Sequence, residues 1–249
     1  MIKNTKVNAA IIIIGNEILS GRTQDTNTST IAQWLNSIGV KVNEVRVIPD
    51  TENTIIENVN HLRKVYNYVF TTGGIGPTHD DITAQSISKA FKLEYEIHKE
   101  AFKILETYYK VGEFNEGRQK MVWMPRNAEL ILNPTSGAPG FSVENVFCLP
   151  GVPSILKSML GGLQNELVGG EPIISHTISL RTVESEIAES LTNVQNNNKD
   201  LEIGSYPFFQ AGKLGVSIVI RSEKQSKIDK CCSQILEFVN KKKINIVDR

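Results

Sequence analysis

Two adjacent carboxylates follow a glycine-rich turn in this sequence. The turn spans residues 72–79 and reads Thr-Gly-Gly-Ile-Gly-Pro-Thr-His, and Asp80 and Asp81 come directly after it. Glycines allow a tight turn and a close approach of the backbone to a ligand. Unpaired N–H groups at a helix start favour a phosphate, and carboxylates beside a phosphate repel it unless a cation lies between them. The segment therefore predicts a phosphate site that uses a divalent metal ion.

Two further acidic residues are expected to join this site. Asp50 follows a proline at the end of an expected strand, and Glu17 lies in a loop that is flanked by glycines. We expect Asp50 and one or both of Asp80 and Asp81 to position the metal ion, Mg²⁺, Mn²⁺ or Co²⁺. Glu17 or His79 is expected to orient or deprotonate an attacking water.

Simpler roles remain open for each of these residues. Either Asp80 or Asp81 is suited to cap the following helix, and Asp50 is also typical of a turn. A lone histidine such as His79 more often has a structural hydrogen bond than a catalytic role. Gly74 and Gly76 also fit the first half of a dinucleotide-binding fingerprint, but His79 replaces its third glycine, so a nicotinamide site is weakly supported.

The elements that must position these residues alternate between strand and helix. Strands are expected at residues 7–14, 41–48 and 68–71, with helices around residues 31–38, 55–62 and 82–91. Continuously apolar strands that alternate with helices predict a parallel sheet covered on both faces. Ligands bind such sheets outside the carboxyl ends of the strands. The loop 15–27, Asp50 and the glycine turn should therefore meet at one edge.

The remaining pattern predicts a second, smaller domain. Helical spacing recurs at residues 98–109 and 121–124, a hairpin is expected at 141–149, and a helix begins at Pro153. After a linker at 169–172, the order is strand 173–180, helix 184–196, strands 201–208 and 215–221, and helix 226–242. We predict a three-layer α/β/α domain with a mostly parallel sheet at residues 1–170 and a ferredoxin-like α+β domain at residues 171–249.

Composition excludes several classes of protein. The 249 residues carry 27 basic and 27 acidic side chains, which argues against nucleic-acid binding. No apolar run approaches the ~20 residues that a membrane-spanning helix needs. The three cysteines, Cys148, Cys231 and Cys232, are odd in number and fit a reducing compartment. We expect a cytoplasmic protein with no membrane partner.

Taken together, these motifs resemble the molybdopterin-binding domain family. That family includes the adenylyltransferase MogA, the gephyrin G domain and the N-terminal part of competence/damage-inducible protein A (CinA), to which the likeness is greatest. The resembling segments are residues 15–27, 72–83, 138–141 and 149–153, within a domain at about 7–168. The ligand-binding residues predicted from them are Gly15, Asn16, Asp25, Asn27, Thr72, Gly73, Gly74, Gly76, Pro77, Thr78, His79, Ala138, Pro139, Gly140, Pro150, Gly151 and Val152.

The resemblance implies a pterin or nucleotide ligand that carries a phosphate or pyrophosphate. The two catalytic aspartates of the adenylyltransferases fall on Asp50 and Asp81, and Glu17 is the third expected catalytic residue. CinA-like relatives imply metal-dependent hydrolysis of ADP-ribose-type pyrophosphates. Adenylylation of molybdopterin in molybdenum cofactor biosynthesis is the first alternative, and ligand binding without catalysis is the second.

One departure from the family pattern, the chain length and the behaviour of relatives also lead to expectations. Ser136 and Gly137 stand where the family often has Gly-Thr, which affects contacts to the end of the ligand. The chain is too short for the C-terminal deamidase domain of CinA, so that activity is expected to be absent. Relatives self-associate, and we expect a homo-oligomer.

Overall fold

The structure, a computed structural model, describes residues 7–210 and 212–247. The chain divides into two compact units, one that ends at Gly170 and one that begins at Glu171. Each unit has its own buried core and is described by itself.

The first unit contains a six-stranded sheet. Its strand order is β2-β1-β3-β8-β7-β6. The four strands β2, β1, β3 and β8 run parallel to one another, whereas β7 is antiparallel to both of its neighbours. The bounds are β1 (Asn8–Ile14), β2 (Lys41–Ile48), β3 (Tyr68–Thr72), β6 (Glu129–Ile131), β7 (Gly140–Val143) and β8 (Val146–Leu149). The expected mostly parallel sheet is confirmed.

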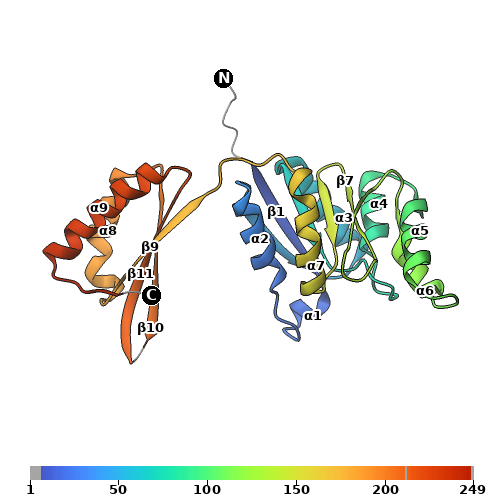
Figure 1. The fold of residues 1–249 in the computed structure, drawn as a ribbon, viewed down its shortest axis with the longest axis horizontal. Coiled ribbons are helices and arrows are strands. Elements are labelled where there is room, and N and C mark those ends of the chain that lie inside the picture. The colour runs from blue at the N-terminus through green and yellow to red at the C-terminus, as the bar shows by residue number, and fades with distance from the viewer. Residues whose placement is uncertain (1–6, 211, 248–249) are drawn as a thin grey trace, which may run out of the picture. The chain divides into compact units, whose positions relative to one another are not determined.

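Helices cover both faces of this sheet, and the three-layer prediction is confirmed. On one face, α2 (Asn27–Ser37) and α7 (Pro153–Leu160) bury Ile31, Leu35 and Leu156 against β1, β3 and β8. On the other, α3 (Glu52–Val65), α4 (Thr83–Phe91) and α5 (Lys99–Tyr108) bury Ile55 and Ile87. In Figure 1, β1 runs down to α1 (Asn16–Leu19), so the carboxyl ends of the parallel strands lie at the lower edge of this unit.

The strands follow from their residue types. Strand β1 consists almost entirely of alanine and isoleucine, and its residues 9–14 are all buried, because side chains alternate between the two faces and both are covered. Strand β2 lies at the sheet edge and alternates exposed and half-buried residues, so the expectation of continuously apolar strands is wrong there.

Several short elements differ from the sequence-based prediction. Residues 121–124 are not an α-helix: a 3₁₀ turn, η1 (Lys120–Val122), leads into strand β5 (Trp123–Pro125), which pairs with β4 (Tyr95–Ile97). The apolar run is short, and such runs do not distinguish helix from strand. The loop 15–27 contains the one-turn helix α1, and the helical turn α6 (Glu116–Gln119) precedes η1. A 3₁₀ turn, η2 (Gly161–Asn165), follows α7.

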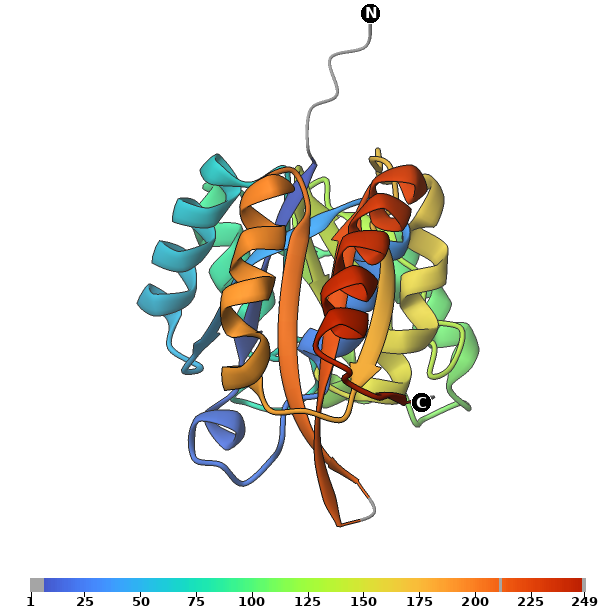
Figure 2. The same cartoon turned by 90° about the vertical axis from the view of Figure 1, so that its left-hand side faces the viewer.

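The second unit is a four-stranded antiparallel sheet with two helices on one face. Its elements are β9 (Ile174–Leu180), α8 (Glu184–Asn197), β10 (Glu202–Gln210), β11 (Lys213–Ser222), α9 (Gln225–Lys241) and β12 (Ile246–Val247). The strand order β10-β11-β9-β12 places β11 between β9 and β10, which is the split β-α-β arrangement of ferredoxin-like folds. Figure 2 shows α8 and α9 side by side over the sheet. Ile228, Cys231 and Ile235 of α9 enter the core.

In the part of the chain that the structure describes, every helix is too short or too polar to cross a lipid bilayer.

Candidate functional site

A cavity of about 600 Å³ opens at the carboxyl ends of the parallel strands. Its walls come from the ends of all four: Ile14 closes β1, Asp50 follows β2, Gly73 follows β3 and Pro150 follows β8. The lining residues are Ile14, Glu17, Thr23, Asp50, Gly73, Gly74, Ile75, Gly76, Pro77, Asp80, Asp81, Met121, Asn133, Ser136, Ala138, Pro139, Pro150, Gly151, Val152, Pro153 and Ile155.

The glycine turn forms one wall and tolerates no side chain at its first two glycines. Gly73 and Gly74 have φ angles of +104° and +68°, a region that other residues rarely adopt. A Cβ on Gly73 would lie 2.1 Å from the carbonyl oxygen of Ile14, and one on Gly74 would lie 2.2 Å from Oγ1 of Thr83. The turn is therefore held directly against β1 and the start of α4.

The N–H groups of this turn are not all free. The N–H of Gly73 donates to the carbonyl of Leu149 at 3.1 Å, so it is engaged within the sheet. Within the described residues, the N–H groups of Gly74, Ile75 and Gly76 have no acceptor. The N–H groups of Gly74, Ile75 and Gly76 are therefore available to an anion, and that of Gly73 is not. The first turn of α4 lies farther along the chain, and its Thr83 N–H already donates to the Gly74 carbonyl at 2.9 Å.

Asp81 lies against the turn and is held by one neighbour. Its Oδ2 accepts hydrogen bonds from the N–H of Thr78 at 2.8 Å and from the Thr78 hydroxyl at 2.6 Å. A Cβ on Gly76 would lie 2.7 Å from the same oxygen, so the missing side chain at Gly76 makes room for the carboxylate. Asp81 does not cap α4, because the N-cap residue is Ile82 and no side chain caps that helix.

Asp50 is tied to the loop after β1. Its Oδ2 accepts a hydrogen bond of 2.8 Å from the backbone N–H of Asn16. Partial burial raises the pKa of the Asp50 carboxyl above its ordinary value of 3.8, and the negative charges of Glu17 and Asp80 raise it further, against the lowering effect of the Asn16 bond. Glu17 and Asp80 therefore both act on the charge of Asp50.

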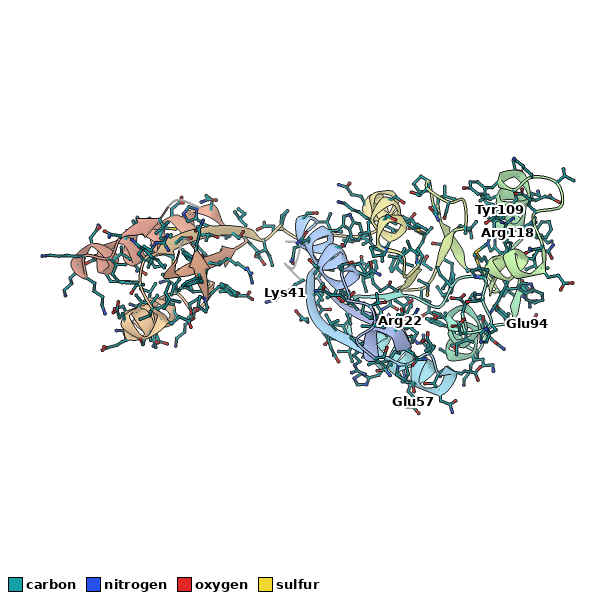
Figure 3. All side chains as sticks on the ribbon, turned by 90° about the horizontal axis from the view of Figure 1, so that it is seen from below. Arg22, Lys41, Glu57, Glu94, Tyr109 and Arg118 are labelled. Atoms are coloured by element: carbon teal, nitrogen blue, oxygen red, sulfur yellow. The ribbon has the colours of Figure 1, made fainter. Side chains whose placement is uncertain are left out.

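The cavity is strongly acidic. Glu17, Asp50, Asp80 and Asp81 line it, and none of the described lining residues is a lysine or arginine. An anionic ligand would be repelled at these walls unless a cation neutralised part of the charge. Arg22 precedes the lining residue Thr23 but is itself exposed on the loop (Figure 3).

Asn27 connects three segments beneath the cavity. Its buried Nδ2 donates to Oγ1 of Thr72 at 2.8 Å and to the carbonyl of Gly151 at 2.8 Å. Asp25 accepts from the N–H of Asn27 at 2.9 Å and so holds the start of α2. Asn27 therefore locks the turn after β8 against the end of β3.

The predicted site residues fall into two groups. The structure brings one group together on the cavity wall: Glu17, Asp50, Gly73, Gly74, Gly76, Pro77, Asp80, Asp81, Ala138, Pro139, Pro150, Gly151 and Val152. The others lie outside the lining set: Gly15, Asn16, Asp25, Asn27, Thr72, Thr78, His79 and Gly140.

Several of the second group support the wall from behind. Thr78 and Asn16 hold the carboxylates, while Asn27 and Thr72 join the two turns. Gly140 packs within the sheet, where a Cβ would lie 2.4 Å from the carbonyl oxygen of Cys148. The His79 side chain is 98% exposed and its Nδ1 lies 4.0 Å from Asp80, so this structure gives it no firm position beside the cavity.

The prediction missed several lining residues. Thr23, Met121, Asn133 and Ile155 all contribute to the wall, and so does Ser136, which the sequence marked only as a departure from the family pattern. Asn133 organises its loop: its Nδ2 donates to Ser136 Oγ at 2.7 Å and to the Ala138 carbonyl at 2.8 Å. The dense turn-forming residues at 133–140 were the only sequence signal for this wall.

The carboxylates of this cavity suit a divalent metal ion that is shared between the protein and a phosphate ligand. Within residues 7–210 and 212–247, no three His, Cys, Asp or Glu side chains converge to form a complete metal-binding cluster. Mg²⁺ is commonly held by one or two carboxylates together with phosphate oxygens and waters, and it favours oxygen ligands of the kind found here. Asp50 and Asp81, from separate loops on the same cavity, suit this shared mode.

Comparison with protein families assigns both units. Residues 10–169 match the family described as the probable molybdopterin binding domain. Residues 172–248 match the middle domain of FAD synthase.

Individual relatives agree with this assignment. A protein of Archaeoglobus fulgidus is 35% identical over 94% of this chain and 98% of its own length. A Clostridium botulinum protein described as competence-damage inducible is 30% identical over 92% of this chain, which spans only 60% of that relative. The crystal structure of the protein CinA from Thermoplasma acidophilum, of unknown function, matches 66% of this chain and 99% of its own with a TM-score of 0.61 and 32% identity.

Proposed function

Because the chain belongs to the molybdopterin-binding domain family, we propose that its acidic cavity binds a nucleotide such as ADP-ribose and hydrolyses the pyrophosphate with the help of a divalent metal ion. One observation carries the proposal. Three free backbone N–H groups and four carboxylates line the same cavity, at the edge of the sheet where such folds bind ligands.

The chain's own groups divide the work. The N–H groups of Gly74, Ile75 and Gly76 donate hydrogen bonds to phosphate oxygens, and these neutral donors add no side chain to the cavity. Asp50 and Asp81 would hold the metal ion. The Asp50 carboxylate is fixed by the backbone N–H of Asn16, and the Asp81 carboxylate is fixed by that of Thr78. A bound divalent ion would offset phosphate charge and lower the pKa of a bound water.

In this proposal Glu17 serves as the general base. Its carboxylate lines the cavity on the loop that also carries Asn16, and it lies close enough to Asp50 to influence the pKa of that carboxyl. A carboxylate in hydrogen-bonding reach of the attacking water removes its proton as the bond to phosphorus forms. The bond between the attacked phosphorus and the bridging oxygen breaks, and the leaving phosphate keeps the electron pair of that bond on its oxygen.

The family is described as a probable molybdopterin binding domain, which favours a pterin ligand, and adenylyl transfer to molybdopterin is therefore the second candidate function. The same N–H groups and carboxylates serve both reactions, and the difference is whether water or a pterin phosphate attacks the nucleotide. A third candidate, binding without catalysis, retains the cavity and lacks turnover.

Product analysis separates the three candidates. The purified chain is incubated with ADP-ribose, or with ATP and molybdopterin, in the presence of Mg²⁺, Mn²⁺ or Co²⁺. AMP and ribose phosphate from ADP-ribose support hydrolysis, and adenylylated pterin supports transfer. Calorimetric binding of ADP-ribose with no product under any of the three metals would reject the hydrolase proposal.

A further inference from the structure

A lysine outside the cavity reaches the bend that carries Asp81. Lys120 begins the 3₁₀ turn η1, and its ammonium group donates to the carbonyl oxygen of Thr78. The same carbonyl accepts the N–H of Asp81 at 3.2 Å. Lys120 also lines a narrow recess behind the glycine turn together with Gly76 and Asp81.

Thr78 connects Lys120 to the Asp81 carboxylate. Its carbonyl receives Lys120, while its N–H and hydroxyl donate to Asp81 Oδ2 at 2.8 and 2.6 Å. All three polar groups of Thr78 therefore form hydrogen bonds. The Asp81 carboxylate lies close to Gly76, on the side where another residue would have its Cβ. In the described part of the chain, no hydrogen bond engages Asp81 Oδ1, so this oxygen remains available to a ligand in the cavity.

The segment before Lys120 is itself anchored. Asn115 caps α6 by accepting the N–H of Arg118 at 3.1 Å. The Arg118 guanidinium lies 4.2 Å from the centre of the Tyr109 ring, and the two residues lie side by side in Figure 3. A Cβ on Gly117 would lie 3.9 Å from the Pro77 carbonyl, so α6 passes close to the bend. Lys120 therefore extends from a supported segment.

The local charges indicate why a lysine occupies this position. Four carboxylates line the cavity, and no described lining residue is cationic. Lys120 lies behind Asp81, in the recess and not on the cavity wall. Its ammonium group holds the bend electrostatically without occupying space that a ligand needs.

We propose that Lys120 is a positioning residue of the site, which fixes the Asp81 carboxylate by anchoring the Thr78 carbonyl. The catalytic consequence rests on the proposed function, whereas the anchoring does not. A water molecule can replace a hydrogen bond to a carbonyl, but it does not connect the bend to α6. Losing Lys120 should therefore release the bend while leaving the fold intact.

Hydrogen exchange tests the anchoring directly. We would compare the parent with Lys120→Met and Lys120→Arg, using Lys103→Met on the exposed face of α5 as the matched control. The N–H groups of Thr78 and Asp81 are expected to exchange at least tenfold faster in Lys120→Met and close to the parent rate in Lys120→Arg and Lys103→Met. Unchanged exchange in Lys120→Met, at unchanged thermal stability, would overturn the proposal.

Turnover of ADP-ribose with Mn²⁺ tests the consequence. Lys120→Met is expected to lower kcat about tenfold with KM within twofold of the parent, and Lys120→Arg to restore most of kcat. Loss of activity that Lys120→Arg does not restore, or an equal fall of kcat in Lys103→Met, would contradict a positioning role. If the parent itself has no turnover, the proposed function fails, and hydrogen exchange still decides whether Lys120 anchors the bend.

Discussion

The carboxylate of Asp50 accepts a 2.8 Å hydrogen bond from the backbone N–H of Asn16. The bond joins the loops that follow β2 and β1, two neighbouring parallel strands. It holds Asp50 at the cavity although burial and the nearby charges of Glu17 and Asp80 disfavour its ionised form. A neutral residue at this position is therefore expected to be more stable.

Replacing Asp50 by asparagine should stabilise the protein at neutral pH. The folded state raises the pKa of the Asp50 carboxyl above 3.8, so folding is penalised whenever this group is ionised. The penalty is complete at neutral pH, declines as pH falls through the raised pKa and disappears below the ordinary value. Asp50→Asn keeps an oxygen that can accept from Asn16. Its unfolding free energy by urea titration should exceed that of the parent at pH 7, and the difference should close on acidification.

The same variant provides a test of metal binding. Mn²⁺ should raise the melting temperature of the parent and have much less effect on Asp50→Asn. Asp229→Asn, on an exposed position of α9, is the control and should follow the parent in both experiments. An Asp50→Asn variant that is less stable than the parent at pH 7 would show that the carboxylate itself supports the fold.

Gly73 and Gly74 should tolerate substitution less well than the other residues of the turn, and Gly74 offers the clearer test. Gly74→Ala places a methyl group 2.2 Å from Thr83 Oγ1 in a residue with φ of +68°. Gly21 has a similar φ of +72° but nothing within 4 Å of an added Cβ. We expect Gly21→Ala to cost about 1 kcal/mol and Gly74→Ala about 2–4 kcal/mol of unfolding free energy. If urea denaturation gives the same loss of unfolding free energy for both variants, the contact with Thr83 adds nothing to the cost of the backbone conformation.

Asn27 should matter for stability as well as for the cavity. Asn27→Ala removes one buried hydrogen bond to Thr72 and one partly buried hydrogen bond to Gly151, and it should lower the unfolding free energy by about 1–3 kcal/mol. Asn36→Ala, at an exposed position of the same helix, should change it by less than about 0.5 kcal/mol. A comparable loss in both variants would mean that helix propensity, not the buried bonds, sets the effect.

The cysteines should differ in their reactivity toward a thiol reagent. Burial raises the pKa of Cys148 to about 12 and that of Cys231 to about 11, so neither forms much thiolate at pH 8. Cys232 is only partly buried, and burial also raises its pKa. Titration of the native protein should detect at most one slowly reacting thiol, against three after denaturation. Rapid reaction of two or more native thiols would contradict the packing of the cores.

The convergence of Asp50, Glu17 and the glycine turn was predictable from local signals. Each lies just after an expected strand, and parallel strands bring their carboxyl ends to the same edge of a sheet. The turn itself was recognisable from its three closely spaced glycines, because glycine allows the backbone to turn tightly. These inferences needed only residue type and order, and the strand order confirms their structural basis.

The contacts that hold the site were not predictable in this way. Lys120 donates to a backbone carbonyl 42 residues away. Every residue has such a carbonyl, so the sequence does not show which one Lys120 contacts. The role of Asn27 depends on contacts to Thr72 and Gly151, which are far from it in the sequence. Strand β5 was missed because three residues form it and its pairing with β4 is decided by tertiary contacts.

Asp81→Asn offers the most direct test of the central claim. The variant retains an oxygen that can accept from Thr78 but loses the charge that the proposed metal site requires. With ADP-ribose and Mn²⁺, the parent should release AMP and ribose phosphate, and Asp81→Asn should do so at least about 100-fold more slowly at unchanged stability. Hydrolysis by Asp81→Asn at the parent rate would contradict the account.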